Sequence, residues 1–155
     1  MFSANTYKSR RAELRKRIGS GLILIAGNTY SPNNYPNNAY YFRQDSTFLY
    51  YFGLNLPTLM AVIDAESGEE MLYGDDFTVD DIIWMGPQPT VVELGAQVGV
   101  VNTLPLDALA GFISVAVKSG TPVHYLPPYR GKTTLQLCSL LGKSPEQIFK
   151  EMSVD

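Results

Sequence analysis

An unbroken apolar run, LILIA at residues 22–26, is the feature that most constrains how this chain can fold. Such a run is typical of a strand buried on both faces, and that strand needs helices on either side of its sheet. Residues 6–18 before it predict a helix with apolar side chains on one face, ended by Gly19. After it, residues 58–64 and 70–74 predict an antiparallel hairpin around the turn DAESGEE.

The second half of the chain favours helices. Residues 105–120 have the clearest amphipathic pattern, with an inner side made of Leu106, Leu109, Phe112, Ile113, Ala116 and Val117. Residues 122–126 predict a further strand, and residues 131–142 and 144–152 predict two short helices. Helices alternate with strands, but one hairpin is antiparallel. The expected fold class is therefore α/β or α+β, a mixed central β-sheet flanked by helices, in one domain over residues 1–155.

Aromatic residues are concentrated in YYFRQDSTFLYYFG, residues 40–53, where seven of the fourteen residues are aromatic. Its second half, residues 47–53, is expected to form a strand. A strand built only for a core would not contain the polar insert. In this insert Arg43 and Asp45 can pair with each other or with backbone in a loop, and Gln44 is both donor and acceptor. Two interpretations stay open for this insert: a binding surface, where aromatic rings and arginine are enriched, or a polar turn that closes one end of a sheet.

Charge and cysteine content limit the classes of partner and compartment. The net charge is -3, and six of the twelve Lys and Arg residues fall between Lys8 and Arg17, which favours a solvated helix face over a nucleic-acid site. The single cysteine, Cys138, excludes an internal disulfide, fits a reducing compartment and is expected to be a buried structural thiol. No segment is long enough to cross a membrane, so we expect a cytoplasmic protein with no membrane or nucleic-acid partner.

The residues needed for a self-sufficient active site are scarce. The one histidine, His124, is expected to have a structural, hydrogen-bonded role. Zinc sites lack Cys and His ligands, and the pairs Asp75–Asp76 and Asp80–Asp81 are better explained as turn and helix-start residues. Thr78 and Thr90 each precede an acidic residue three positions later, which predicts two capping boxes. We therefore assign no catalytic residue and no metal ligand to this chain.

Several short motifs follow one another in a recognisable order. Arg10 and Arg11 lie in the first expected helix, and the buried run LILIAG comes next. The phrase FRQDSTFLY follows at residues 42–50. Gly53 and Pro57 then bound a turn, and a Trp-x-Gly element, WMG, occurs at residues 84–86 after the hairpin.

This ordered set, spread over residues 1–126, resembles the N-terminal domain of Xaa-Pro aminopeptidases, proline-specific peptidases related to prolidase and creatinase. Leu54 departs from the family pattern, which has an aromatic residue after the glycine of the turn. The resemblance implies a fold like the creatinase and aminopeptidase P N-terminal domain, with a ribonuclease H-like layout. It also implies that residues 1–155 are a single accessory domain.

In this family the catalytic groups belong to a C-terminal domain of pita-bread fold, which the resemblance places outside this chain. Two divalent ions, commonly manganese, are held there and activate a bridging water. The resemblance thus implies no cofactor in this chain, no activity of this chain alone, and short proline-containing peptides as substrates of the parent protein.

The family's N-terminal domain shapes the mouth of the active site and supports oligomers. The implied partners are the chain's own catalytic domain and further copies of the protein. Candidates for substrate access or an interface are Phe42, Arg43, Gln44, Asp45, Tyr50 and Trp84. Three alternatives stay open: a stand-alone binding or oligomerisation module derived from this domain, a domain of an Xaa-Pro dipeptidase (prolidase), and an independent enzyme that uses His124.

Overall fold

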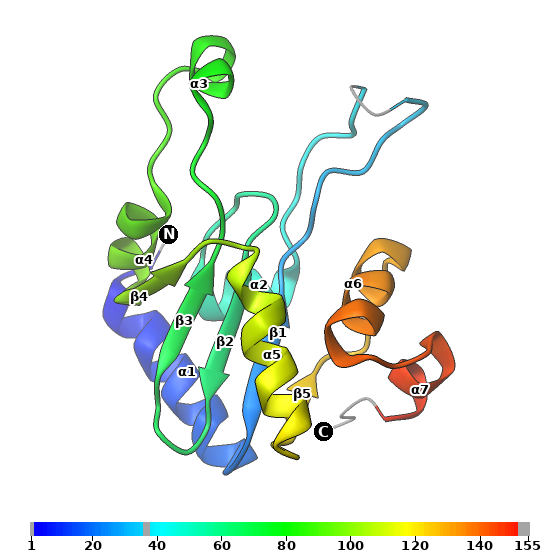
Figure 1. The fold of residues 1–155 in the computed structure, drawn as a ribbon. Helices are drawn as coiled ribbons and strands as arrows, with labels where there is room; N and C mark the ends of the chain where they lie inside the picture. Colours follow the sequence, from blue (N-terminus) through cyan, green and yellow to red (C-terminus); the bar gives the residue numbers. More distant parts are fainter. Residues whose placement is uncertain (1, 36–37, 152–155) are drawn as a thin grey trace.

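The computed structural model describes residues 2–35 and 38–151, and its centre is a five-stranded sheet in the order β4-β3-β2-β1-β5 (Figure 1). The strands are β1 (Leu22–Ala26), β2 (Met60–Asp64), β3 (Glu70–Tyr73), β4 (Asn102–Leu104) and β5 (Val123–Tyr125). β2 pairs antiparallel with β1 and β3, whereas β5 is parallel to β1 and β4 is parallel to β3. The expected mixed sheet, its buried strand and its hairpin are confirmed.

Helices cover both faces of the sheet (Figure 1). One face packs against α1 (Ala4–Ile18), α2 (Ser46–Phe52) and α4 (Val91–Val98), and the other against α5 (Ala108–Lys118), α6 (Gly131–Leu141) and α7 (Pro145–Lys150). Along β1, Ile23 and Ile25 belong to the first apolar cluster, and Leu22 and Leu24 belong to the second. This double burial explains why the strand is apolar at successive positions.

Residues 47–53 form the helix α2, so the prediction of a strand there was wrong. Asp45 is the N-cap, and its Oδ1 accepts hydrogen bonds from the backbone N–H groups of Thr47 and Phe48. Phe48 and Phe52, four positions apart, are both fully buried on one side of the helix. The aromatic composition suggested a strand, but the cap and the four-residue spacing decide the conformation.

Three further features differ from what the sequence predicted. β4 was not predicted, since its three residues are partly exposed and its apolar pattern is weak. In α5, Leu109, Ile113 and Ala116 are buried as expected, but Phe112 and Val117 lie at the edge of the inner face and are exposed. Cys138 on α6 is half-buried, not fully buried, and it packs at the margin of the cluster under α5.

A fully buried arginine, Arg11, joins three elements on the α1 face. Its Nη1 donates to the carbonyl of Tyr51 at the end of α2, 2.9 Å away, and its Nη2 donates to the carbonyl of Val98 at the end of α4, also at 2.9 Å. The same Nη2 lies 2.8 Å from a carboxylate oxygen of Glu70 on β3. Arg11 therefore satisfies the carbonyl groups that two helix ends leave open and ties both helices to the sheet.

Two segments stand away from this body (Figure 1). The Asn-rich arm comprises the described residues between 29 and 42, and an antiparallel bridge between Pro32 and Ala39 joins its two sides. The α3 arm comprises residues 75–90 and holds α3 (Val79–Met85) at its far end. Both arms project from the same end of the sheet.

Candidate functional site

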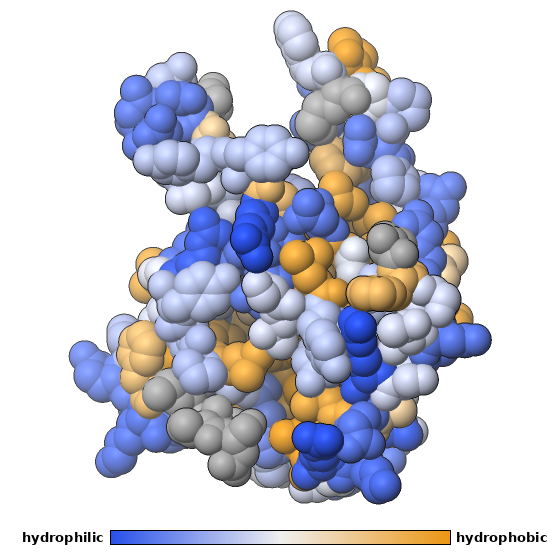
Figure 2. All heavy atoms as spheres, turned by 180° about the vertical axis from the view of Figure 1, so that it is seen from behind, coloured by the Kyte–Doolittle hydropathy of each residue, from blue (hydrophilic) through white to orange (hydrophobic). Residues whose placement is uncertain are grey.

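Exposed aromatic and aliphatic side chains gather on the two arms. On the Asn-rich arm, Tyr41 is 98% exposed, and on α3, Trp84 is 88% exposed and Ile83 is 71% exposed. Hydrophobic side chains are visible at the end of the α3 arm in Figure 2. Large exposed apolar residues that cluster on a projecting segment are typical of a surface that contacts another polypeptide.

The α3 arm owes its shape to two capping boxes, both of which were predicted. Thr78 accepts a hydrogen bond from the backbone N–H of Asp81, whose carboxylate accepts one from the N–H of Thr78 in return. Thr90 and Glu93 make the same reciprocal pair at the start of α4. The Thr78 box fixes how the chain enters α3 at the far end of the arm, and the Thr90 box fixes how it enters α4, where the arm rejoins the body.

The polar insert of the aromatic stretch is a structural connector around a buried Gln44, whose side chain is 1% exposed. Its Oε1 accepts from the N–H groups of Asn28 and Asp45, and its Nε2 donates to the carbonyl of Leu56 at 2.7 Å. Gln44 therefore joins the end of β1, the start of α2 and the loop before β2. Its side chain is not available to a partner at the surface, so its place among the interface candidates needs correction.

The neighbours of Gln44 have different positions. Phe42 is half-buried and packs edge-on against the ring of Tyr30, with 5.4 Å between ring centroids. Arg43 is exposed, and its backbone carbonyl accepts from the side chain of Asn28. Asp45 uses one carboxylate oxygen to cap α2 and the other to accept from Tyr129. Of the two expected alternatives for Asp45, pairing with backbone is therefore the one that the structure has.

The last two candidates lie on different helices, Tyr50 on α2 and Trp84 on α3. Tyr50 is on the outer side of α2, 51% exposed, with the Arg10 guanidinium 4.2 Å from its ring centroid. Arg10 also donates to the backbone carbonyl of Tyr50, which fixes the stacked geometry. Trp84 is at the end of the α3 arm. Five of the six predicted residues thus lie on α2 or just before it, and Trp84 lies apart from them on α3.

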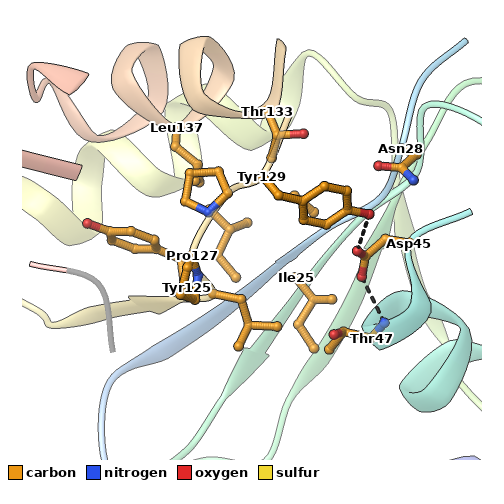
Figure 3. A pocket seen from close by; sticks show the side chains of 13 residues that line it. Ile25, Asn28, Asp45, Thr47, Tyr125, Pro127, Tyr129, Thr133 and Leu137 are labelled. Atoms are coloured by element: carbon orange, nitrogen blue, oxygen red, sulfur yellow. Dashed lines mark hydrogen bonds between the residues drawn. The ribbon is translucent and has the colours of Figure 1, made fainter. Parts of the chain in front are cut away.

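A cavity of about 240 Å³ opens where β1 and β5 end side by side (Figure 3). Residues that line it include Ile25, Asp45, Tyr125, Pro127, Tyr129 and Leu137. The Tyr129 hydroxyl donates to Asp45 at 2.8 Å, which links the segment after β5 to the start of α2. Burial raises the pKa of the Tyr129 phenol, and the adjacent Asp45 carboxylate also raises it, so the phenol stays protonated and acts as a donor at neutral pH.

Sequence reasoning missed this cavity because its walls are distant in the chain. The Tyr129–Asp45 hydrogen bond spans 84 positions, and Asn28 comes from a third segment. The available signal was LPPY, residues 126–129, which follows a predicted strand at the edge where open α/β sheets commonly bind ligands. Its lining combines apolar residues such as Ile25 and Leu137 with polar ones such as Asp45 and Thr133.

His124, Asp75 and Asp76 each form a hydrogen bond with a backbone group of the chain. The Nε2 of His124 lies 3.0 Å from the carbonyl of Ser20. Asp76 accepts from the N–H of Val91, and Asp75 accepts from the N–H of Leu106. Among residues 2–35 and 38–151, the structure has no group of three or more His, Cys, Asp or Glu side chains placed to hold a metal ion.

Within the part of the chain that the structure describes, no helix is both long enough and apolar enough to span a membrane.

Comparison with solved structures supports the fold. The chain superposes on a variant of Escherichia coli aminopeptidase P in complex with substrate with a TM-score of 0.75 and 20% identity, covering 92% of this chain and 33% of that one. The low-pH form of the same enzyme gives a TM-score of 0.74 at 20% identity, covering 95% of this chain and 35% of that one.

Sequence comparison gives the family. A probable Xaa-Pro aminopeptidase of Aspergillus flavus is 29% identical over 98 residues, 61% of this chain and 19% of that protein. Its counterpart in Aspergillus oryzae is 28% identical over 92 residues, 57% of this chain and 18% of that protein. The chain thus spans about a fifth of the length of these relatives. The family model for the aminopeptidase P N-terminal domain matches residues 7–124, and the chain belongs to this family.

Proposed function

We propose that residues 1–155 are the non-catalytic accessory domain of a proline-specific metallo-aminopeptidase, and that their arms contact the catalytic domain or a neighbouring subunit. In that position the arms would limit access to the active site and support an oligomer. The relatives named as Xaa-Pro aminopeptidases support the choice of parent enzyme, since this chain matches about a fifth of each.

One observation carries the contact role: the most exposed large side chains of the described chain include Tyr41 and Trp84, and both lie on arms that stand away from the packed body. Tyrosine and tryptophan supply much contact area for little loss of conformational freedom, and they are enriched at interface hot spots. The base of the α3 arm is ordered by the Thr90 capping box and by Asp76, which accepts from the N–H of Val91. An arm that is ordered before any partner binds lowers the cost of association.

The chemistry of the parent follows from the same proposal. The divalent ions, with manganese the expected metal, would be bound by the catalytic domain, and the substrates would be short peptides with proline in the second position. A cytoplasmic location suits the single cysteine, Cys138.

Trp84 gives the direct test of the contact role. In the full-length parent, the double change Ile83→Ser and Trp84→Ala should weaken the contact by roughly 2 kcal/mol, or about thirtyfold, because an exposed tryptophan on an ordered arm is a hot-spot anchor. Sedimentation velocity would measure the oligomer, and KM for a proline-containing peptide would measure access.

Val101→Ser is the matched control for that experiment. Val101 is 90% exposed but lies beside β4, away from both arms, so its replacement should change neither the assembly nor KM. The thermal midpoint should stay the same for all variants because the altered side chains are exposed. If the α3 variant keeps the oligomer mass and the KM of the unchanged parent, the proposed contact role is wrong.

A further inference from the structure

Two neighbouring parallel strands, β1 and β5, send the chain to opposite faces of the sheet. After β1 the chain leads to α2, whose Phe48 and Phe52 pack in the apolar cluster on the α1 face. After β5 it leads to α6, whose Leu137 and Leu141 pack in the cluster on the other face. In open α/β sheets such a divergence opens a crevice at the carboxyl ends of the two strands, and ligands commonly bind there.

The cavity in Figure 3 lies in this crevice. Ala26 and Tyr125, the last residues of β1 and β5, line it together with Leu126. Its volume of about 240 Å³ is below the roughly 300–1,000 Å³ of pockets that hold drug-sized molecules, so its ligand has only a few non-hydrogen atoms. The described residues that line it belong to neither arm, which makes it distinct from the contact surface proposed above.

Asp45 is the one charged side chain among the described residues that line this cavity. Arg130 follows Tyr129 in the chain, but its guanidinium donates to the backbone carbonyl of Thr29 and it does not line the cavity. The described lining therefore has a negative charge and no positive one, and it favours a cationic ligand over an anion.

Three side-chain oxygen atoms from distant segments can accept hydrogen bonds from such a cation. Asp45 uses Oδ1 to accept from two backbone N–H groups, while Oδ2 has one partner in the described structure, the Tyr129 hydroxyl at 2.8 Å. That hydroxyl gives its proton to Asp45 and keeps the lone pairs of its oxygen. The Asn28 amide nitrogen donates to the carbonyl of Arg43, which leaves the amide oxygen as an acceptor. Figure 3 shows Asn28, Tyr129 and Asp45 together on one side of the cavity.

A primary ammonium group matches this arrangement. It supplies three N–H donors and no acceptor, whereas a carboxylate ligand would meet Asp45 with like charge. The other walls include Ile25, Pro127 and Leu137, which suit a short hydrocarbon chain. A divalent metal ion takes more oxygen ligands than one carboxylate and a few neutral groups supply.

We propose that this cavity binds a primary ammonium group carried on a short hydrocarbon chain. Asp45 and Tyr129 accept the hydrogen bonds of the ammonium, and the apolar wall that includes Ile25 and Leu137 surrounds the chain. Two sources share this chemistry, a free small amine and the side chain of a lysine in a peptide. Such a site is present whether or not the arms contact a catalytic domain, so it goes beyond the proposed function.

Chemical-shift titration of the 155-residue chain with n-butylammonium measures the binding. The backbone amides of Asn28, Thr47 and Thr133 should shift together and saturate, with a dissociation constant on the order of 1 mM for so small a ligand. n-Butanol, which has a similar shape and no charge, should bind about tenfold more weakly, because it cannot make a charge-assisted hydrogen bond. Butyrate should not bind, since its charge has the same sign as that of Asp45.

Asp45→Asn separates the charge of this side chain from its role in the fold. Asparagine caps helices as well as aspartate does, so α2 should be retained while the negative charge is lost. The affinity for n-butylammonium should fall about tenfold, and the affinity for n-butanol should stay the same. Asp64→Asn is the matched control, because Asp64 also accepts from two backbone N–H groups but pairs with Leu22 at the other end of β1. This control should bind n-butylammonium like the unchanged chain.

The source of the ammonium is identified by a further probe, Nα-acetyl-lysine methylamide, which presents a lysine side chain without a free α-amine. If it binds more tightly than n-butylammonium at the same amides, the ligand is a lysine side chain, and the reverse order identifies a free amine.

Three results would overturn the inference. They are the absence of a saturable shift up to about 20 mM n-butylammonium, equal affinities for n-butylammonium and butyrate, and an equal loss of affinity in Asp45→Asn and Asp64→Asn. If Asp45→Asn does not fold, the comparison of n-butylammonium with butyrate on the unchanged chain still decides the question.

Discussion

Replacing Arg11 with Met should lower the free energy of unfolding of this domain by about 3 kcal/mol, since breaking a buried ion pair leaves its partners uncompensated. The side chain is fully buried, so water cannot replace the hydrogen bonds that the substitution removes. Glu70 would keep its charge beside an apolar group, and the carbonyls of Tyr51 and Val98 would lose their donors. In a domain of this size the thermal midpoint should fall by roughly 10 °C, measured by calorimetry or circular dichroism.

Arg17→Ala is the matched control on the same helix. Arg17 pairs with Glu13 at 2.9 Å, but both side chains are largely exposed, so the thermal midpoint should barely change. Arg11→Lys should resemble Arg11→Met more than the unchanged protein, because an ammonium group cannot reach three acceptors in the geometry of the guanidinium fork. Equal midpoints for the Arg11→Met and Arg17→Ala variants would show that the buried arginine does not hold α1, α2 and α4 together.

Gly53→Ala should destabilise the domain by roughly 3 kcal/mol. Gly53 ends α2 with φ of 67°, and an alanine in this left-handed conformation costs about 1 kcal/mol. In addition, a Cβ at this position would overlap the phenol of Tyr7, which is buried between α1 and α2. Displacing that ring from a packed core adds a cost on the order of 2 kcal/mol. Urea titration of the variant measures the sum.

Gly142→Ala separates the two contributions. Gly142 ends α6 with φ of 64°, almost the same conformation, but its Cβ would meet no heavy atom within 4 Å. Its replacement should therefore cost only the backbone term, about 1 kcal/mol. If Gly53→Ala and Gly142→Ala lower the free energy of unfolding equally, the Tyr7 ring moves aside without a measurable cost. The α1–α2 contact is then looser than the structure indicates.

The parts of the fold that could be predicted are those specified by short stretches of sequence. The apolar run at residues 22–26 indicates by itself a strand buried on both faces. The capping boxes at Thr78 and Thr90 each depend on two residues only three positions apart. α2 was predicted wrongly because its aromatic residues favour strands in general, whereas the cap by Asp45 and the burial of Phe48 and Phe52 decide the outcome here.

The candidate site could be predicted only in part, since its contacts join distant segments. The exposure of Trp84 depends on the α3 arm standing away from the body, and no local pattern reveals this. Gln44 looked like a polar surface residue, but contacts with Asn28 and Leu56, more than ten positions away in either direction, bury it. The family resemblance pointed to residues 42–50 without distinguishing the buried Gln44 from the exposed Arg43 and Tyr50.

We propose that this chain is an accessory domain and that catalysis belongs to another part of the parent protein. Purified residues 1–155 and the full-length parent should be compared for hydrolysis of an Xaa-Pro peptide in the presence of Mn²⁺, with Mn²⁺ binding followed by calorimetry. We predict hydrolysis and Mn²⁺ binding by the parent, and neither by residues 1–155. Hydrolysis of the peptide by purified residues 1–155 would contradict the account.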